Sequence, residues 1–252
     1  MSLIFKTIRQ TAAATILFTA TGMAAQAQDI VMATGQQGGS WYPVGGAIKA
    51  IMERENPDMD ITVMPGAGVS NVVGVDAGRF GIAFANSIST VDSMSGKEPF
   101  RKATTNVCNL GILYPQYFQI VALADSGIET VADMKGKAVN IGNPGSGTRA
   151  LADVLMAANE ITPGDLGLAA KLKSSEQAAA LCDGNIDAAI WAAGLPNGST
   201  MEATSTCDIE LLDLSTSNLE RVLEQNKAYA KANIPGGMYP GNDSDVVSWG
   251  PK

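Results

Sequence analysis

No histidine occurs among the 252 residues of the chain. Because histidine is the usual general base near neutral pH and the commonest metal ligand, this absence disfavours a Ser-His-Asp hydrolase and a histidine-bound metal. Cysteine occurs three times without a C-x-x-C pair, which argues against a zinc site. The glycine-rich loops lack the lysine of a P-loop and the spacing of a dinucleotide-binding fold. We therefore expect no catalytic residues, no metal and no cofactor.

Basic residues are also few, with 17 Lys and Arg against 25 Asp and Glu and a net charge of −8. Two of the cations, Lys6 and Arg9, lie in an N-terminal segment that we expect to be removed, so the mature chain is more acidic still. Nucleic acids and anionic membranes attract basic patches, and neither is an expected partner. A small anion remains a suitable ligand, because helix N-termini bind anions locally.

The N-terminal segment has the organisation of a secretory signal peptide. Lys6 and Arg9 form a positive region, residues 12–20 are mostly apolar, and Ala25-Gln-Ala27 offers a small-residue cleavage site. The alternative, a transmembrane anchor, requires roughly 20 apolar residues, which neither this segment nor a later one provides. We therefore predict that residues 1–27 are cleaved and that the mature chain is exported to the periplasm.

Two glycine-rich loops each join a predicted strand to a predicted helix. Residues 35–40 follow a strand at 30–33, and residues 142–147 follow a strand at 138–141. Such a turn leaves free backbone N–H groups at the positive end of a helix, which suits an anion. Two such loops about a hundred residues apart suggest a ligand held between two lobes.

The overall pattern predicts an α/β protein. Strands at 30–33, 61–64 and 80–85 alternate with helices, the first of which Ser40 can cap. This alternation favours a parallel sheet, with ligands beyond the carboxyl ends of its strands. Ser174 with Gln177 resembles a capping box that opens a later helix.

The middle of the chain has a long apolar stretch, residues 110–124, interrupted by Tyr114-Pro-Gln-Tyr117. Either one broken strand passes between two lobes here, or a turn joins two unrelated strands. Near the end, the pattern predicts a helix over 219–232 and irregular loop for the last twenty residues. The predicted divisions are lobe 1 over 28–116 with a hinge near 114–117, lobe 2 over 117–216, and a return segment toward lobe 1 over 217–252.

The three cysteines do not fix a pairing by themselves. In an oxidising compartment we favour Cys182 with Cys207, because both flank one apolar strand. This bond would close a loop of roughly 25 residues and contribute about 3 kcal/mol to stability. Cys108 is then expected to be a buried free thiol.

Several motifs, in order along the chain, resemble those of one family. They are Thr34-Gly-Gln-Gln-Gly-Gly-Ser-Trp-Tyr-Pro-Val-Gly-Gly46, Leu113-Tyr-Pro-Gln-Tyr117, Ala124-Asp-Ser-Gly127, Gly142-Asn-Pro-Gly-Ser-Gly-Thr-Arg149, Asp183-Gly-Asn-Ile-Asp-Ala188, Gly194-Leu-Pro-Asn197 and Tyr239-Pro-Gly-Asn-Asp243. They resemble the TAXI receptors, the solute-binding proteins of tripartite ATP-independent periplasmic (TRAP) transporters. The resemblance implies a type II periplasmic-binding-protein fold: two α/β lobes, a hinge and a ligand cleft. It also implies a small carboxylate ligand, such as glutamate or 2-oxoglutarate, delivered to an integral membrane permease by a protein that we expect to be monomeric.

The same resemblance marks ligand-binding residues in both lobes and at the hinge. In lobe 1 and the hinge these are Gly38, Gly39, Ser40, Trp41, Tyr42, Asn71, Ser87 and Tyr114, with Tyr117 as a further candidate. In lobe 2 they are Gly145, Ser146, Gly147, Thr148, Trp191, Pro196 and Asn197, with Arg149 as a further candidate. Plainer roles stay open for some of them. The aromatic residues can be core packing, and Arg149 can be a surface ion pair.

The chain departs from the family pattern in three respects. Leu195 stands where many relatives have histidine, and Gln116 stands where many have glutamate. Relatives also continue beyond residue 252, so we expect an incomplete lobe 1 with exposed apolar surface. The alternative function is a periplasmic sensing module that presents the bound anion to a signalling receptor, because one cleft would serve both roles.

Overall fold

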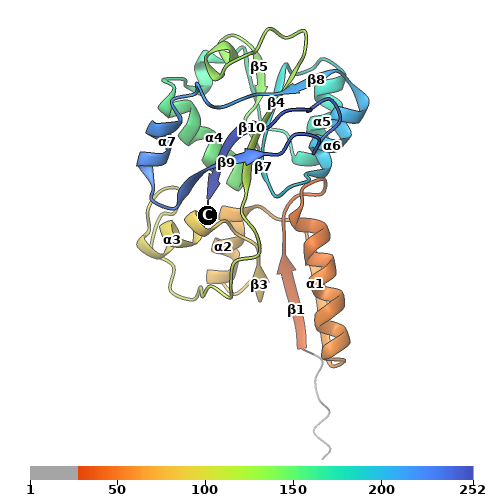
Figure 1. Ribbon diagram of the computed structural model, residues 1–252. Helices are drawn as coiled ribbons and strands as arrows, with labels where there is room; N and C mark the ends of the chain where they lie inside the picture. The colour runs from red at the N-terminus through yellow and green to blue at the C-terminus, as the bar shows by residue number, and fades with distance from the viewer. Residues whose placement is uncertain (1–27, 252) are drawn as a thin grey trace, which may run out of the picture.

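A computed structural model describes residues 28–251, which form two α/β lobes with separate sheets (Figure 1). The two lobes that the sequence predicts are therefore present. The predicted signal peptide, residues 1–27, lies outside the described residues. The predicted boundaries between lobes and return segment remain a proposal.

Lobe 1 is built on a three-stranded parallel sheet with the order β2-β1-β3. Its apolar core contains Met32, Ile61 and Phe84, against which Val44 and Ile48 of the first helix pack. Since all three strands are parallel, their carboxyl ends share one edge of the sheet. The elements are β1 (Gln28–Ala33), α1 (Trp41–Glu55), β2 (Met59–Met64), α2 (Gly68–Asp76), β3 (Ile82–Ala83) and α3 (Ser87–Ser95).

Lobe 2 has a five-stranded mixed sheet with the order β6-β5-β7-β4-β8. Strands β5, β6 and β7 run parallel, whereas β4 is antiparallel to β7 and β8. The carboxyl ends of β5, β6 and β7 therefore share the edge that faces lobe 1 (Figure 1). The elements are β4 (Tyr117–Leu123), η1 (Val131–Met134), β5 (Ala138–Asn140), α4 (Gly147–Ala158), η2 (Pro163–Asp165), β6 (Leu168–Ala170), α5 (Ser174–Cys182), β7 (Ala188–Ala193), α6 (Gly198–Thr206) and β8 (Ile209–Leu211).

The C-terminal segment contradicts two predictions. The helix predicted over 219–232 ends early, as α7 (Leu219–Gln225), and strand β9 (Tyr229–Ile234) follows it. The predicted terminal loop contains a strand, β10 (Val246–Pro251), antiparallel to β9. Both errors have one cause, which is tertiary packing. Trp249 is fully buried and stacks on Phe118 of β4, with 5.2 Å between the ring centroids. This packing fixes the segment as a hairpin on lobe 2.

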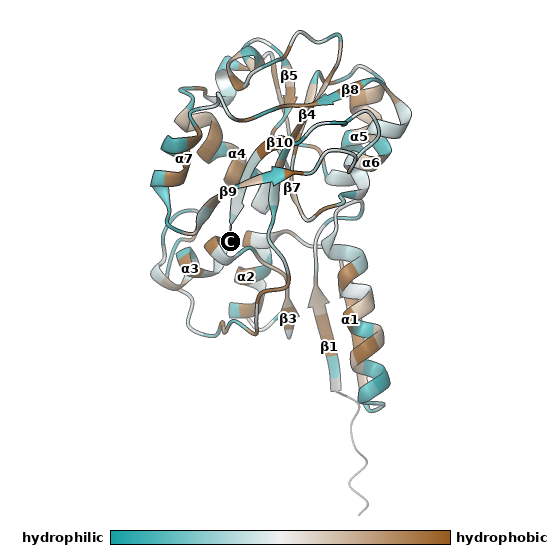
Figure 2. Cartoon of the chain, viewed as in Figure 1, coloured by the Kyte–Doolittle hydropathy of each residue, from teal (hydrophilic) through white to brown (hydrophobic). Residues whose placement is uncertain are grey.

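The connection between the lobes also differs from its prediction. Of the apolar stretch 110–124, residues 117–123 form β4, whereas Leu110, Ile112 and Leu113 lie outside any strand and are largely exposed. This part of the chain runs beside β3 and is coloured as apolar in Figure 2. It borders an apolar hollow of about 480 Å³ in lobe 1. Lobe 1 thus leaves apolar surface uncovered.

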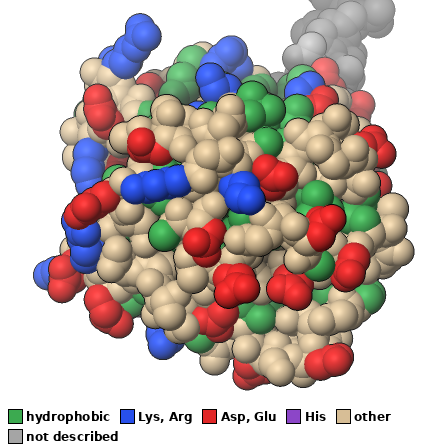
Figure 3. Space-filling model, turned by 90° about the horizontal axis from the view of Figure 1, so that it is seen from above, with side chains coloured by type: hydrophobic (Ala, Val, Ile, Leu, Met, Phe, Trp, Pro, Cys, Tyr) green, Lys and Arg blue, Asp and Glu red, His purple; other side chains and the backbone are tan. Residues whose placement is uncertain are grey.

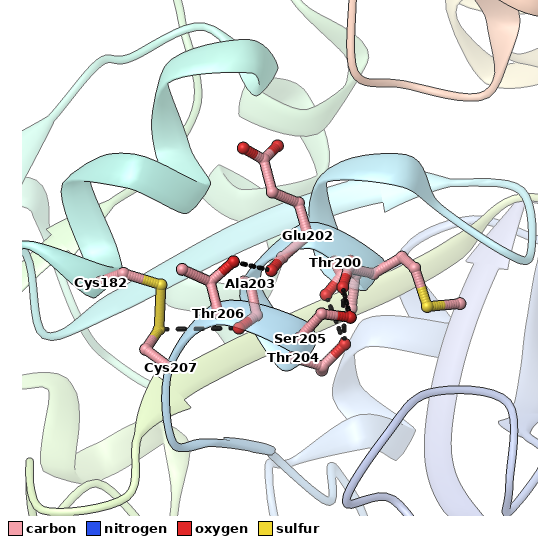
Figure 4. Close-up of a disulfide and its surroundings, with 9 residues drawn as sticks. Cys182, Thr200, Glu202, Ala203, Thr204, Ser205, Thr206 and Cys207 are labelled. Carbon is pink, nitrogen blue, oxygen red and sulfur yellow. Dashed lines mark hydrogen bonds between the residues drawn. A yellow bond between two sulfur atoms is a disulfide. The ribbon is translucent and has the colours of Figure 1, made fainter.

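The cysteines give one agreement and one correction. A disulfide bond with an S–S distance of 2.11 Å joins Cys182, at the end of α5, to Cys207, just after α6 (Figure 4). This is the pairing that the sequence favours. Cys108 is free but exposed, so the expectation of a buried thiol is wrong. It lies in the exposed connection rather than in a core strand, which explains the difference.

Candidate functional site

A cavity of about 60 Å³ lies between the two lobes. In each lobe it is bordered by the sheet edge that holds the carboxyl ends of the parallel strands. Lobe 1 contributes the loops after β1 and β2, and lobe 2 contributes the loops after β5, β6 and β7. The lining residues are Gly35, Gln36, Gly39, Ser40, Trp41, Gly66, Ala67, Gly68, Gln116, Gly142, Asn143, Ser146, Gly147, Thr148, Ser174, Gln177, Trp191, Ala192, Ala193 and Asn197.

The N-terminus of α4 points its first backbone groups at this cavity. Ser146 is the N-cap residue: its hydroxyl donates to Asn143 O at 2.7 Å and accepts from Arg149 N–H at 3.0 Å. Within residues 28–251, the N–H groups of Gly147 and Thr148 donate to no protein acceptor. Free N–H groups at a helix N-terminus favour an anion through both hydrogen bonding and the helix dipole. The cap therefore presents backbone donors, while the Ser146 hydroxyl is used within the helix.

Four lining side chains carry a buried polar atom that has no partner among residues 28–251. These atoms are Trp191 Nε1, Gln116 Oε1, Gln177 Oε1 and Asn197 Oδ1. Buried polar groups are normally hydrogen-bonded, because an unpaired one costs roughly 1–3 kcal/mol. Four of the seven such atoms among residues 28–251 line this cavity, which makes it the candidate site for a ligand.

Direct hydrogen bonds between the lobes close the cavity. Ser40 Oγ, in lobe 1, accepts from Gly194 N–H of lobe 2 at 3.1 Å and from the Tyr114 hydroxyl at 3.1 Å. Burial raises the pKa of Tyr114, although its hydrogen bond to Ser40 acts in the opposite direction, and a protonated Tyr114 can donate. Backbone bonds from Ser199 N–H to Gly38 O (3.0 Å) and from Ser70 N–H to Gly145 O (3.4 Å) also cross the cleft. These bonds describe a closed arrangement of the lobes.

Ser40 does not have its predicted role as a helix cap. Its side chain makes no capping hydrogen bond to α1, because the hydroxyl faces the other lobe. The predicted capping box at Ser174 is likewise wrong. The helix begins with Glu176 Oε2 accepting from Lys173 N–H at 2.9 Å, one residue earlier than expected.

Backbone dipoles, rather than side-chain charges, polarise the lining of the cavity. No Asp, Glu, Lys or Arg is among its lining residues in the described part of the chain. Arg149, the nearest candidate cation in sequence, pairs through Nε with Asp153 at 2.8 Å one turn along α4. Charged side chains lie instead on the outer surface, where Asp and Glu are spread over the face of lobe 2 seen in Figure 3. The site is thus electrically neutral in its side chains.

Comparison of the sequence with protein families gives one match. A family model described as NMT1-like matches residues 32–250. The chain belongs to the NMT1-like family.

Solved structures share the fold of the NMT1-like chain. The periplasmic aliphatic sulphonate-binding protein SsuA from Escherichia coli is 20% identical, with 80% of this chain and 68% of that protein covered and a TM-score of 0.50. An ancestral arginine-binding protein, bound to arginine, is 15% identical over 80% and 94% of the two chains, also at 0.50. A binding protein of an ABC phosphonate transporter from Pseudomonas aeruginosa is 12% identical over 88% and 82%, at 0.50. These likenesses confirm the predicted periplasmic-binding-protein-like fold, and these neighbours are binding proteins rather than enzymes.

Across residues 28–251 of the NMT1-like chain, every helix is too short or too polar to cross a bilayer.

The structure gathers eight of the seventeen predicted site residues of the NMT1-like chain at the cavity. Those that line it are Gly39, Ser40, Trp41, Ser146, Gly147, Thr148, Trp191 and Asn197. Those outside its lining are Gly38, Tyr42, Asn71, Ser87, Tyr114, Gly145, Pro196, Arg149 and Tyr117. Gly38, Gly145 and Tyr114 take part in the bonds between the lobes instead.

Asn71 shows why a predicted residue can lie outside the cavity. Its side chain is 1% exposed, and Oδ1 accepts from Ala67 N–H while Nδ2 donates to Thr34 O and Phe84 O at 2.7 and 2.8 Å. The amide thereby joins the ends of β1 and β3 to the start of α2. Its hydrogen-bonding capacity is used within lobe 1.

Sequence reasoning missed several lining residues, chiefly Gln36, Gln116 and Gln177. Gln116 departs from the family pattern, and the sequence predicts a helix-capping role for Gln177 instead. Gln36 lies in the loop after β1 and Gln177 in the first turn of α5, whereas Gln116 directly precedes β4. The three glutamines share no position along the elements, so no common sequence signal marks them.

Proposed function

We propose that this NMT1-like protein is an exported solute-binding protein that captures a small carboxylate between its lobes without changing it chemically. The observation that carries the proposal is the set of unpaired donors at the cavity: the N–H groups of Gly147 and Thr148 and Trp191 Nε1. A carboxylate accepts such bonds at both oxygens, and bonds to a charged acceptor are stronger than neutral ones. Trp41 and Trp191 supply apolar walls that exclude water from the bound anion.

Export and the membrane partner belong to the same proposal. The signal-peptide pattern of residues 1–27 and the TAXI-like motifs support a periplasmic receptor that hands its ligand to a TRAP-type permease. The lobes would open to release the ligand, and the hydrogen bonds between them would re-form on closure. A sensing module that docks on a signalling receptor is the alternative partner arrangement.

The test is calorimetry and thermal-shift screening of the chain from residue 28 to residue 252. The panel contains amino acids, keto acids and dicarboxylates, together with neutral sugars and metal cations. We expect binding among the carboxylates and none among the sugars or cations. Binding of a sugar or cation alone would contradict the proposal. Co-purification with TRAP membrane subunits, rather than with a receptor kinase, would distinguish the two partners.

A further inference from the structure

Two residues line both the ligand cavity and the apolar hollow of lobe 1. They are Trp41, at the start of α1, and Gln116, immediately before β4. The cavity measures about 60 Å³ and the hollow about 480 Å³. Among residues 28–251, no charged side chain lines either space. A small cavity with polar groups thus adjoins a much larger apolar one.

The Trp41 ring lies between the two spaces. On one side, a Cβ built at Gly68 would be 3.5 Å from Trp41 Cη2, and Gly68 lines the cavity but not the hollow. On the other side, the indole packs against Phe84 with 6.0 Å between the ring centroids, and Phe84 lines the hollow but not the cavity. The indole is therefore a wall between the cavity and the hollow.

Close packing holds this wall in place. A Cβ built at Gly35 would lie 2.9 Å from Trp41 Cβ, closer than real Cβ atoms come to another atom, so the loop before α1 fits tightly against the tryptophan. Trp41 also packs against the apolar core of lobe 1, which contains Met32, Ile61 and Phe84. A different position of the ring would break these contacts, which are as dense as in other protein interiors. The wall therefore stays closed while lobe 1 keeps this packing.

The wall also lies close to the donors at the N-terminus of α4. The Cβ built at Gly68 would be 3.7 Å from Gly147 N, so this N–H group and the Trp41 ring border the same position. A carbon chain that extends from a carboxylate bound at Gly147 toward lobe 1 soon meets the indole. The volume sets a similar limit, because about 60 Å³ is less than half of the roughly 150 Å³ that admits benzene. The closed cavity therefore suits an acid of about two or three carbons.

We infer that Trp41 is a specificity-determining residue that restricts the protein to short-chain carboxylates. Acids with a longer apolar tail are excluded by the indole, although an apolar hollow lies directly behind it. This inference rests on the proposed capture of a carboxylate. The carboxylate itself is bound at the N-terminus of α4, whereas Trp41 acts on the tail, so the two parts of recognition are separable.

The test measures by calorimetry how tightly acetate, propionate, butyrate, hexanoate and octanoate bind. The unmodified protein should bind acetate or propionate best and hexanoate at least tenfold more weakly. Trp41→Ala should reverse this order, because the tail can then enter the hollow and each methylene that leaves water raises the affinity about fourfold. Trp41→Leu, which keeps an apolar side chain against Phe84, should also reverse it and serves if thermal unfolding shows that Trp41→Ala does not fold. Met52→Ala is the control, since Met52 lines only the hollow and the indole stays in place, and it should keep the original order.

Several outcomes would overturn the role of Trp41. They are an unchanged order of affinities in the Trp41 variants, an equal loss of affinity for all five acids, and tighter binding of octanoate than of propionate by the unmodified protein. If none of the acids binds any of these proteins, the proposed function fails instead. Ligand-free crystal structures then decide the wall by themselves: the cavity and the hollow should be separate in the unmodified protein and continuous in Trp41→Ala. Separate spaces in both structures would contradict the inference.

Discussion

Ser40 contacts both the other lobe and the connection between the lobes in the closed cleft. Its oxygen accepts two hydrogen bonds, from Gly194 N–H of lobe 2 and from Tyr114 in the connection between the lobes. Both partners are therefore satisfied only when the lobes are closed. Since Ser40 also lines the cavity, its own proton can reach a bound molecule. The Ser40 hydroxyl thus takes part both in holding the lobes closed and in lining the cavity.

We expect Ser40→Ala to favour the open state, because the two donors lose their acceptor. Each lost hydrogen bond is worth about 1 kcal/mol, so ligand affinity should fall about tenfold or more. Calorimetry measures the affinity, and small-angle X-ray scattering measures the expected increase in the radius of gyration without ligand. Ser95→Ala is the control, since Ser95 is exposed and bonds only to its own helix. Equal scattering from both variants would contradict the role of Ser40 in closure.

Trp191 allows a test of the donors at the cavity. Trp191→Phe removes an Nε1 that has no protein partner, so no internal hydrogen bond is lost. We expect affinity for the carboxylate to fall about tenfold. Trp249→Phe is a matched control: its Nε1 is also buried and unpaired, but the residue lies outside the cavity lining. Equal affinities of the two variants would show that Trp191 makes no hydrogen bond to the ligand.

The residues also show what sequence patterns predict about a site. The position of the glycine loops after strands predicts them near the ligand, the family resemblance predicts Trp191 there, and both line the cavity. The roles of Ser40 and Asn71 were not predictable, because each depends on partners brought together by folding. A polar residue at the end of a strand can cap a helix, join two loops or face a ligand. The local sequence pattern does not distinguish these three roles.

At the scale of elements, α4 and α3 approach each other across the cleft with little space. A Cβ added at Gly147 would lie 2.7 Å from Asn86 Nδ2, and Asn86 is held in place as the N-cap of α3. Real Cβ atoms do not come this close to another atom. The absence of a side chain at position 147 therefore permits the first turn of α4 to reach lobe 1.

Gly147→Ala should consequently weaken lobe closure while leaving both lobes folded. The added methyl group displaces Asn86, so we expect weaker ligand binding and a larger radius of gyration in the presence of ligand. Gly46→Ala is the control, because a Cβ there meets nothing within 4 Å and should stabilise α1 by roughly 0.5–1 kcal/mol. A Gly147→Ala protein that binds and compacts normally would disprove the steric account.

The disulfide bond links the ends of two helices in lobe 2. It restricts a segment of 25 residues in the unfolded chain, so removing it should lower the free energy of unfolding by about 3 kcal/mol. The double variant Cys182→Ala, Cys207→Ala, followed by urea denaturation, measures this change. Cys108→Ala should have little effect, because Cys108 is exposed and unpaired. A loss below about 1 kcal/mol in the double variant would contradict the expectation.

Elements with a strong local pattern were predictable, whereas those fixed by packing were not. The helix α1 and the loop before α4 follow from periodicity and glycine content. Strand β9 reads as helix in the sequence, since residues 227–232 continue the helical composition of α7. Its pairing with β10 over Tyr229–Ile234 overrides that local preference.

At the scale of the molecule, the sequence predicted two lobes and the edges at which they meet. Parallel strands place their carboxyl ends at one edge of each sheet, so the loops before α1 and α4 each lie at such an edge, and both line the cavity. The direct bonds between lobes could not be predicted, because several use backbone groups that carry no sequence signal. The bond from Ser199 N–H to Gly38 O is one example.

The neutral lining of the cavity has a consequence for the conditions under which the protein works. Backbone N–H groups, amides and an indole do not titrate, and no acid or base is among the lining residues that the structure describes. Affinity for the carboxylate should therefore stay level from about pH 5 to about pH 9, a range in which carboxylates remain ionised. Calorimetry across this range checks the expectation, and a change above tenfold would contradict it. A receptor outside the cytoplasm, exposed to the pH of its surroundings, would then capture its ligand at the same concentration as that pH changes.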